Sequence, residues 1–268
     1  MGDGYVGRMS SVAPTVAVEV VEHVGWIRFD RLPVNAFEWS MVREVRAAID
    51  EMVADPDVRV LVLGSANPKY FSAGADLETF RDIGEAGMRE WCELVHGIVH
   101  RLRNSPKPIL AAIAGIAVGG GLEMTLHADV RFASHDARLG QPEININFIP
   151  PVGATQALAR LLGRPAALRF LYDGQLIDAE QALTIGLVDE VIEVSQLEAT
   201  VQQYAESLAA KPPEALAAIR RAITVGGGMS FDEGLGLEAS LATELAGTAN
   251  FAEGVDSFLS KRSPEWRR

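Results

Sequence analysis

The chain has 268 residues, of which 48% are hydrophobic and 22% are charged, as is typical of a globular protein with a sizeable core. Its net charge of −12 disfavours general binding to the phosphate backbone of nucleic acids, although a local basic patch would still accept one phosphorylated small molecule. The single cysteine, Cys92, excludes an intramolecular disulfide and a cysteine metal cluster.

The front of the chain predicts strands and helices in alternation. Short runs rich in β-branched residues predict strands, and apolar residues at helical spacing predict helices. In chain order we expect strands at residues 16–20 and 25–29, a helix at 39–53, a strand at 58–64, a loop at 65–77, a helix at 88–103, a strand at 109–114, a short helix at 122–127 and a strand near 130–133.

The rear of the chain, beyond two consecutive prolines at positions 150 and 151, is mostly helical in pattern. Helices are expected at residues 154–162, 165–172, 179–185, 196–210, 213–224, 231–245 and 251–259. A strand-rich front and a helical rear indicate an α/β core followed by a C-terminal helical section.

The sequence contains no membrane-span or signal-peptide pattern. The uncharged run at residues 108–122 is too short and too rich in glycine to cross a membrane. The first residues lack the basic and apolar regions of a secretory signal, so we expect residues 1–14 to be a loose leader. We expect a cytoplasmic protein, and the alanine- and arginine-rich, lysine-poor composition is associated with bacterial genomes.

No metal site is expected from the histidines or the cysteine. His96 and His100 are four residues apart on an expected helix and could share a metal, but neither an HExxH pattern nor a nearby third ligand accompanies them. Cys92 lies between two acidic residues, which disfavour the thiolate, so we expect an inert thiol.

Two glutamates twenty residues apart are the most informative pair in the chain. Glu123 follows three consecutive glycines and is expected just inside a helix, whereas Glu143 follows a proline, which disfavours a helix there. Two carboxylates in one cleft can hold a water and move its protons, which suits addition of water to an activated double bond. Taken alone, each has a simpler explanation, as an acid at a helix end or as an ion-pair partner.

Two glycine-containing segments each follow an expected strand. Residues 70–77 read Tyr-Phe-Ser-Ala-Gly-Ala-Asp-Leu, and residues 117–123 read Ala-Val-Gly-Gly-Gly-Leu-Glu and open a helix. Glycine lets backbone approach a ligand, and a helix N-terminus presents free N–H groups, so one N–H group from each segment could converge on a single oxygen. A glycine cluster on its own is more often a tight turn, and no lysine-serine/threonine pair follows to make a P-loop.

Together these segments resemble the enoyl-CoA hydratase/isomerase (crotonase) superfamily, over about residues 16–266. The matching segments follow the family's order and spacing, and they are residues 71–77, 119–123, 128–129, 140–144, 163–164, 179–189 and 253–262. The resemblance implies an α/β fold, a crotonase-like spiral of ββα turns over residues 15–200. It implies a C-terminal helical trimerisation region over residues 201–268, and so a homotrimer or a dimer of trimers.

The resemblance also implies an acyl-CoA site. The catalytic acids would be Glu123 and Glu143, and the N–H groups of Ala75 and Gly120 would form an oxyanion hole. Coenzyme A would be part of the substrate, so neither a separate cofactor nor a metal is implied. The residues implied in binding it are Val34, Asn35, Ala73, Asp76, Leu77, Phe258 and Lys261, the last two often reaching coenzyme A from a neighbouring subunit.

The implied reaction is hydration of a trans-2-enoyl-CoA to a 3-hydroxyacyl-CoA. The two glutamates would jointly activate water and deliver a proton to C2, with Glu143 the better candidate for the C2 proton. Another acyl-CoA enzyme of the family, such as an isomerase, is an alternative, although isomerases often keep only one of the two acids. A second alternative is a non-catalytic RNA-binding or scaffold protein on the same fold, which the acidic chain and the lysine-free residues 91–103 disfavour.

The sequence departs from the family pattern at a few positions near the site. Asn147, Pro151 and Ala154 stand where glycines are frequent, and all three positions are expected to border the acyl pocket. Leu32 stands where a lysine is common, which would weaken a phosphate contact near the entrance for coenzyme A. Lys261, with Arg262, could make phosphate contacts instead, or could be a solvated basic helix end.

Overall fold

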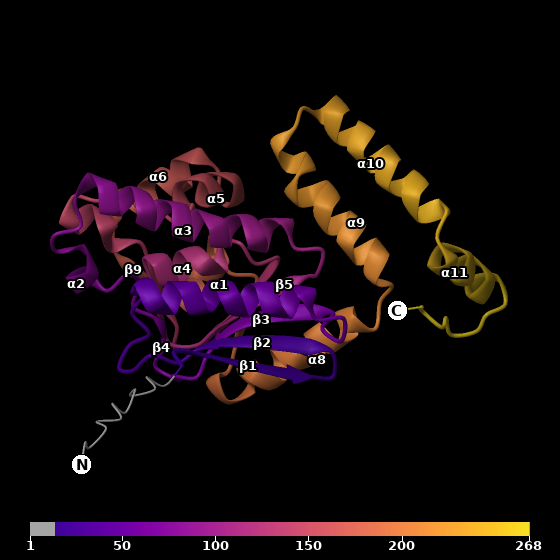
Figure 1. The fold of residues 1–268 in the computed structure, drawn as a ribbon, viewed down its shortest axis with the longest axis horizontal. Coiled ribbons are helices and arrows are strands. Elements are labelled where there is room, and N and C mark those ends of the chain that lie inside the picture. The colour runs from indigo at the N-terminus through magenta and orange to yellow at the C-terminus, as the bar shows by residue number, and fades with distance from the viewer. Residues whose placement is uncertain (1–13, 268) are drawn as a thin grey trace, which may run out of the picture.

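Two β-sheets and the helices around them form the body of the molecule (Figure 1). The computed structural model describes residues 14–267, so the leader expected over residues 1–14 lies, except for Pro14, outside the described residues. The larger sheet has the strand order β1-β2-β3-β5-β7-β10. Its strands are β1 (Val16–Val21), β2 (Val24–Phe29), β3 (Val60–Ser65), β5 (Ile109–Ile113), β7 (Val130–Ser134) and β10 (Glu190–Ile192).

The smaller sheet has the order β4-β6-β8-β9, and its strands are three residues long. They are β4 (Tyr70–Ser72), β6 (Ile116–Val118), β8 (Arg138–Gly140) and β9 (Leu176–Asp178). The expectation of a loop throughout residues 65–77 is therefore wrong at β4. Strands this short carry too few residues for a period-two pattern, so no local pattern predicts this sheet.

The two sheets are built by a repeated path of the chain. In three successive passes, β3 then β4, β5 then β6, and β7 then β8, the chain gives one strand to the larger sheet, one to the smaller sheet, and then a helical segment. The strands contributed within each sheet by these passes are parallel. This repetition is the expected spiral of ββα turns, and it brings the ends of β4, β6 and β8 side by side.

Helices follow the strands around the body and then continue beyond it. They are α1 (Trp39–Ala54), α2 (Leu77–Phe80), α3 (Gly84–Asn104), α4 (Gly120–Thr125), α5 (Ala154–Leu161), α6 (Arg164–Asp173), α7 (Ala179–Thr184), α8 (Leu197–Ala209), α9 (Pro213–Thr224), α10 (Phe231–Ala246) and α11 (Ala249–Leu259). Three short 3₁₀ helices are η1 (Pro142–Ile146), η2 (Val194–Gln196) and η3 (Gly226–Gly228). Among residues 14–267, no helix has the length and apolar character needed to cross a membrane.

The central strands of the larger sheet are buried on both faces, which explains the continuous apolar run at β3. Leu61 and Leu63 point into a core shared with α1, α3 and the smaller sheet. The alternate residues Val60 and Val62 point to the other face, where α8 packs. Successive side chains of the strand therefore enter two different cores, so the residues on both faces of the strand must be apolar.

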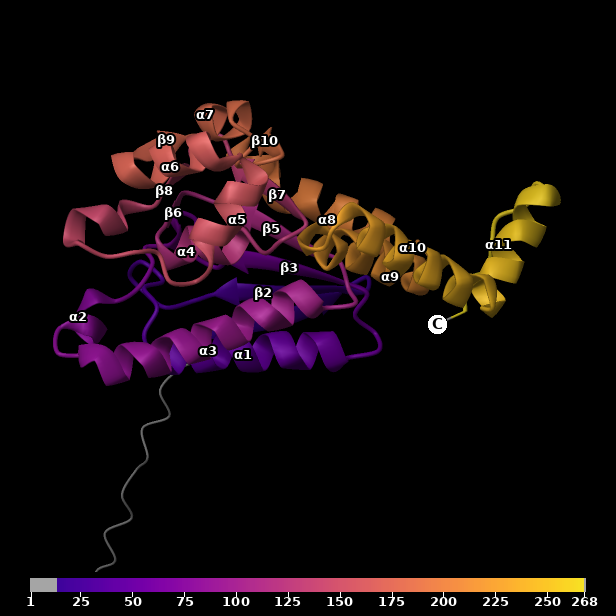
Figure 2. The ribbon, with the colours of Figure 1, turned by 90° about the horizontal axis from the view of Figure 1, so that it is seen from above.

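Helix α8 belongs to the body, and the chain leaves the body only after it. Its buried side chains pack on the larger sheet, so the expected boundary between residues 200 and 201 falls inside α8. From α9 onward the helices extend away from the sheets as an arm (Figures 1 and 2).

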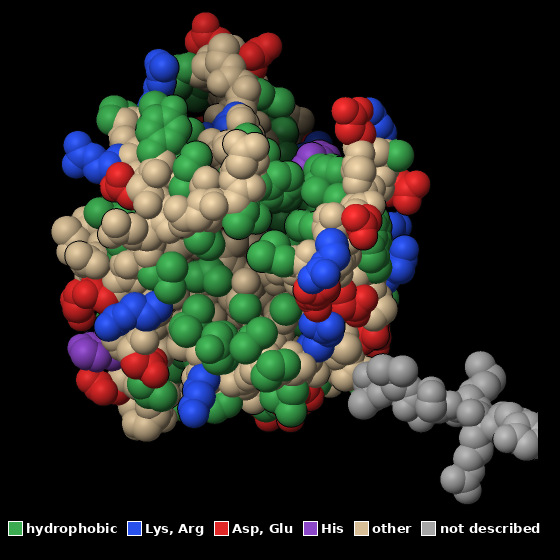
Figure 3. Space-filling view, turned by 90° about the vertical axis from the view of Figure 1, so that its left-hand side faces the viewer, with side chains coloured by type: hydrophobic (Ala, Val, Ile, Leu, Met, Phe, Trp, Pro, Cys, Tyr) green, Lys and Arg blue, Asp and Glu red, His purple; other side chains and the backbone are tan. Residues whose placement is uncertain are grey.

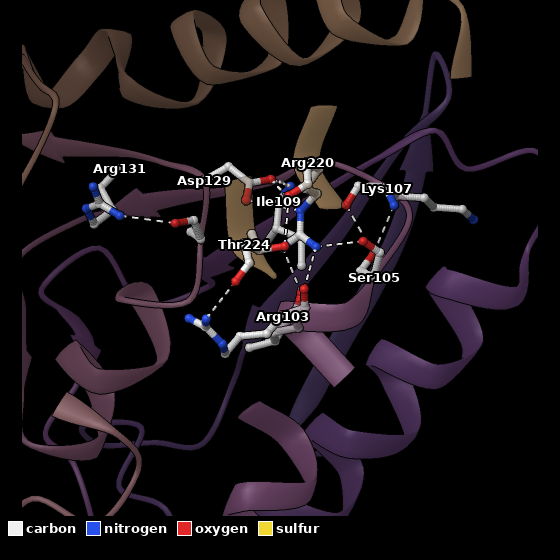
Figure 4. Close-up of polar contacts among 10 residues, drawn as sticks. Arg103, Ser105, Lys107, Ile109, Asp129, Arg131, Arg220 and Thr224 are labelled. Atoms are coloured by element: carbon white, nitrogen blue, oxygen red, sulfur yellow. Dashed lines mark hydrogen bonds and ion pairs between the residues drawn. The ribbon is translucent and has the colours of Figure 1, made fainter. Parts of the chain in front are cut away.

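Arg220 of α9 fastens this arm to the body (Figure 4). Arg220 is 6% exposed, and its Nε donates to Asp129 Oδ2 at 2.8 Å. The remaining N–H groups donate to the carbonyls of Leu102, Arg103 and Ser105 at 2.7, 3.0 and 2.6 Å. These carbonyls belong to the end of α3 and the residue after it, so one side chain satisfies the helix end and joins α9 to it.

Candidate active site

A cavity of about 300 Å³ lies where α1, α3, α4 and η1 meet the ends of the smaller sheet. The two glutamates and the two amides singled out in the sequence come together here, because Glu123, Glu143, Ala75 and Gly120 all line it. They come from different passes of the spiral: Ala75 follows β4, Gly120 follows β6, and Glu143 follows β8. The fold thus places segments far apart in sequence around one space.

The glycines before α4 bring its first turn close to the segment after β4. Gly119 has φ +51° and ψ −132°, which side chains rarely allow. A Cβ at Gly74 would come within 2.8 Å of the Val118 carbonyl, and one at Gly121 within 2.7 Å of Ser72. Both positions therefore need glycine so that the two backbones can approach.

The amides of Ala75 and Gly120 face the same space. A Cβ placed on Gly120 would lie 3.9 Å from the Ala75 nitrogen, so the two residues adjoin. Gly120 is the first residue of α4, and its N–H group has no partner within the helix. Among residues 14–267, neither amide donates to another backbone or side-chain acceptor. Two unpaired N–H groups, of which that of Gly120 is at a helix N-terminus, are suited to stabilising a developing negative charge on oxygen.

Glu123 is held at one carboxyl oxygen and unpaired at the other. The side chain is 0% exposed, and its Oε1 accepts hydrogen bonds from the N–H groups of Val152 at 2.7 Å and Ala154 at 3.0 Å. Its Oε2 has no hydrogen-bond partner among the described residues. The amides fix the carboxyl group, and the second oxygen is left for a ligand or a water.

Glu143 lies across the cavity, in the 3₁₀ helix η1. The expectation that Pro142 disfavours helix holds for an α-helix, but a 3₁₀ turn forms with this proline at its start, where no N–H is needed. A Cβ at Gly119 would lie 2.8 Å from Glu143 Oε1, so the carboxyl group rests against this glycine. In the orientation that satisfies both groups, the buried Gln141 amide donates to both oxygens of Glu143, at 3.1 and 3.0 Å.

Burial raises the pKa of both carboxyl groups. Loss of hydration is the main cause for Glu123, whose pKa is raised to about 8. The negative charge of Glu143 raises this pKa as well, whereas the amides of Ala154 and Val152 lower it. Burial also raises the pKa of Glu143, to about 7. Since two acids titrate in one cavity, the pair keeps on the order of one proton near neutral pH. One carboxyl group can then accept a proton while the other donates one.

The rest of the cavity wall is apolar and aromatic. Helix α3 contributes Trp91, whose ring packs edge-on against Phe80 and Trp39 with centroid distances of 5.0 and 5.1 Å. Among the described residues that line the cavity, the only charged groups are Glu123 and Glu143. Such a wall suits an uncharged apolar group.

The three departures from the family pattern differ in their role. Pro151 lines the cavity, but Asn147 and Ala154 are not among the described lining residues, so the expectation that all three border the pocket is wrong for these two. Asn147 has φ +56°, which explains why glycine suits this position. Ala154 is buried and acts through its N–H group on Glu123.

The residues implied in binding coenzyme A divide into three groups. Ala73 and Leu77 line the cavity, and Asp76 caps α2 and pairs with Arg31 at 3.1 Å beside it. The carbonyl of Val34 accepts the N–H of Ala73 at 2.9 Å, which holds this segment in place. The other two groups, which are Asn35 and the pair Phe258 and Lys261 at the C-terminal end of the arm, lie elsewhere.

The Asn35 side chain is hydrogen-bonded within the protein through both its amide group and its oxygen. It is 0% exposed, and its amide group donates to Ser65 Oγ and to the carbonyls of Tyr70 and Phe71, while its oxygen accepts from the Arg31 N–H. Its side chain therefore holds the segment before β4 and is not free for a ligand.

Phe258 and Lys261 lie at the far end of the C-terminal arm (Figure 1). Phe258 is 84% exposed and borders a different cavity, between α9 and α11. Within one chain the structure does not bring these two residues to the glutamates. Only a second copy of the chain could supply them.

The cavity reaches the surface near α2 and η1. Leu77 and Ile146 line it and are also more than half exposed. The end of the molecule nearest α2 carries many hydrophobic side chains, gathered across one face (Figure 3). An apolar ligand can enter there, next to the amides of Ala75 and Gly120.

Sequence reasoning missed some groups that hold the two acids. The amides of Val152 and Ala154 and the side chain of Gln141 bind the carboxyl groups, and the side chain of His127 binds the carbonyl of Val152. The one available signal was spacing, since His127 is four residues after Glu123 and Gln141 two before Glu143. Among residues 14–267, no group of three or more His, Cys, Asp and Glu side chains could hold a metal ion.

Comparisons with known proteins agree with this geometry. A family model described as enoyl-CoA hydratase/isomerase matches residues 19–268. A short-chain-enoyl-CoA hydratase of Clostridium acetobutylicum is 33% identical over 86% of this chain and 88% of its own length. An (E)-benzylidenesuccinyl-CoA hydratase of Thauera aromatica is 32% identical over 94% of this chain and 98% of its own.

A solved structure repeats the arrangement of the two sheets and the arm. The crystal structure of an enoyl-CoA hydratase from Bacillus anthracis superposes with a TM-score of 0.90 and 31% identity, covering 94% of this chain and 98% of the other. The expected fold is confirmed as the crotonase-like spiral. The chain belongs to the enoyl-CoA hydratase/isomerase family.

Proposed function

We propose that this protein is an enoyl-CoA hydratase that adds water across the 2,3 double bond of a trans-2-enoyl-CoA to give a 3-hydroxyacyl-CoA. The observation that carries the proposal is the meeting, in one apolar cavity, of two carboxyl groups of raised pKa with two unpaired backbone amides. The chemistry of hydration needs these parts and no others.

The thioester carbonyl oxygen lies between the N–H groups of Ala75 and Gly120. As water attacks C3, negative charge moves to this oxygen, and the two amides and the N-terminus of α4 stabilise it. Loss of one such donor typically costs about 3–4 kcal/mol of activation free energy. The same amides bind the ground-state carbonyl less strongly, so they favour the transition state.

Glu123 and Glu143 jointly handle the protons. The ionised member of the pair takes a proton from water as the water oxygen bonds to C3, and the protonated member gives its proton to C2. The elements of water are added without change in the total number of protons on the pair. Glu143, which rests beside Gly119 and close to the oxyanion amides, is the donor to C2 in this scheme, which proceeds from the state of the coupled pair in which the shared proton lies on Glu143 and Glu123 is ionised.

Hydration is redox-neutral and consists of proton transfers and one C–O bond, so we propose that the enzyme uses no cofactor beyond the coenzyme A of its substrate. The acyl group enters the apolar part of the cavity. We propose an uncharged acyl chain, because the wall offers no described cationic partner for a second carboxylate.

We further propose a homotrimer or a dimer of trimers in a bacterial cytoplasm. Phe258 and Lys261 lie too far along the arm to serve the site of their own chain, so a second copy would bring them to coenzyme A. Exposed apolar side chains on the arm, such as Phe251 and Leu259, favour burial against another copy. Bacterial relatives, including one from Bacillus subtilis at 31% identity, favour a bacterial origin.

The test is loss of the conjugated enoyl-thioester absorbance when crotonyl-CoA and longer 2-enoyl-CoA substrates are added. Glu123→Gln and Glu143→Gln should each abolish the reaction without unfolding the protein, whereas Glu85→Gln, which changes an exposed acid of α3, should not. Full activity of either cavity variant would remove the paired-acid mechanism. Turnover of a 3-enoyl-CoA with no hydration of crotonyl-CoA would favour the isomerase alternative.

A further inference from the structure

A buried histidine beside the active site has no part in the proposed proton transfers. His127, just after α4, is 5% exposed, and its Nε2 lies 2.8 Å from the carbonyl oxygen of Val152. A carbonyl oxygen only accepts, so the ring carries a proton on Nε2. Burial lowers the pKa of His127 to about 4, and the nearby charges of Arg103 and His96 add to the effect, so the ring is neutral at physiological pH.

The residue that His127 binds also binds Glu123. Val152 donates its N–H to Glu123 Oε1 at 2.7 Å and accepts at its carbonyl from His127. Glu123 and His127 are four residues apart at the end of one short helical segment. The segment from Glu123 to His127 therefore binds both the N–H and the carbonyl of Val152, which lies in the turn opposite.

The turn formed by residues 151–154 fits closely against the imidazole ring. A Cβ added to Gly153 would come within 3.1 Å of His127 Cε1, and Gly153 has φ +99°. The next residue, Ala154, gives the second N–H bond to Glu123. On the outer side, His96 of α3 donates to the carbonyl of Pro151 at 2.8 Å, but this contact is exposed to water. The contact of His127 is buried and therefore stronger.

We propose that His127 is a positioning residue for Glu123: it fixes the turn of residues 151–154 so that two amides hold one carboxyl oxygen and leave the other for the attacking water. The catalytic consequence rests on the proposed hydratase function. The positioning itself is a property of the folded protein and can be measured separately.

Two changes follow when the imidazole contact is removed. The Val152 carbonyl loses its partner, the turn relaxes, and the amides move away from Glu123 Oε1. Because those amides lower the pKa of Glu123, their withdrawal raises it further, with Glu143 still opposite. The carboxyl group also gains rotational freedom, and small misplacements of a catalytic group can cost about 100-fold in rate.

The experiment compares His127→Leu, which removes the donor, with His127→Gln, whose amide can donate from a position close to Nε2. His100→Leu, on the exposed side of α3, is the matched control for loss of a histidine. Two readouts are measured for each folded variant: the pH dependence of kcat with crotonyl-CoA, and the titration of the Glu123 carboxyl by ¹³C NMR of glutamate-labelled protein, assigned with Glu123→Gln.

We expect His127→Leu to lower kcat by about 10- to 100-fold with little change in KM, and to raise the pKa of Glu123 in the NMR titration. His127→Gln should recover most of both properties, and His100→Leu should match the unaltered protein. An unchanged Glu123 titration in folded His127→Leu, or equal losses in the Leu and Gln variants, would overturn the proposal. If the unaltered protein fails to hydrate crotonyl-CoA, the proposed function is refuted, whereas the NMR titration still decides on the positioning.

Discussion

The carboxyl group of Glu143 rests against the α-carbon of Gly119, so close that a methyl group at this position would come within 2.8 Å of Oε1. The same glycine immediately precedes Gly120, whose amide is one of the two N–H groups that we propose for the thioester oxygen. The absence of a side chain at Gly119 thus sets the distance between the proposed proton donor and the proposed oxyanion site.

Gly119→Ala should therefore lower kcat by about 100-fold or more, because the new Cβ displaces Glu143 and the φ of +51° becomes strained. Gly97→Ala, in the middle of α3, is the control, since its Cβ would meet only the Arg101 side chain at 3.5 Å. Initial rates with crotonyl-CoA check the comparison. Equal rates for the two alanine variants would contradict the placement of Glu143.

The rate should depend on pH as a bell with its maximum in the neutral to mildly alkaline range. Burial raises the pKa values of Glu143 and Glu123 to about 7 and about 8, and hydration needs one protonated and one ionised member of the pair. Below this range both carry protons, and above it neither does. Measurement of kcat from pH 5 to pH 10 checks this, and a maximum near pH 4.5, where ordinary glutamates titrate, would contradict it.

The buried acid should also make stability fall as pH rises. Between pH 4.5 and about 8, Glu123 keeps its proton in the folded protein and loses it in the unfolded chain. The unfolded state then binds fewer protons, so the free energy of unfolding falls by up to about 1.4 kcal/mol per pH unit for this one group. Glu123→Gln removes the titration, and urea denaturation at pH 5 and pH 8 should show a flatter dependence for this variant. An unaltered slope would mean that the carboxyl group is ionised when buried.

Arg220→Met should destabilise the protein by about 3–5 kcal/mol, because it leaves the Asp129 carboxylate without its ion-pair partner and removes the Arg220 N–H groups from three carbonyls. Arg221→Met, on the exposed side of the same helix, should change stability by no more than about 0.5 kcal/mol. Urea denaturation at fixed protein concentration compares the two. A loss below about 1 kcal/mol for Arg220→Met would show that the arm is held by other contacts.

Acyl groups that carry a second carboxylate should be poor substrates. The cavity wall around Trp91, Val95 and Ile98 is apolar, and an unpaired charge placed there loses its hydration without compensation. We expect kcat/KM for (E)-benzylidenesuccinyl-CoA to be at least about 100-fold below that of its methyl ester, in which the charge is removed. Equal values for the acid and the ester would show that the distal end of the acyl group stays in water.

The sequence predicted the parts of the fold that local pattern determines. The strands β3 and β5 are continuous apolar runs because both faces of their sheet are buried, and α1 carries an apolar stripe, so these elements were visible in the sequence. The strands β4, β6 and β8 were not, because each has three residues and is held by neighbours from other passes of the spiral.

The residues of the candidate active site were likewise only partly predictable from the sequence. Glu123 and Glu143 were singled out from motif order, and no spacing rule alone could tell that residues twenty apart share a cavity. The amides that hold Glu123 were missed because they belong to a turn without regular structure. That turn takes its shape from tertiary contacts with His127 and His96, which no local pattern reports.

The chain contains three consecutive glycines twice. At residues 119–121, a side chain would meet Glu143 at the first position, the Phe37 ring at 3.4 Å at the second and Ser72 at the third. At η3, residues 226–228, a side chain at the second or third position would meet nothing within 4 Å. The same three letters therefore exclude a side chain at Gly119 and Gly121 but leave room for one at Gly227 and Gly228, so identical stretches of sequence can differ in their tolerance to mutation.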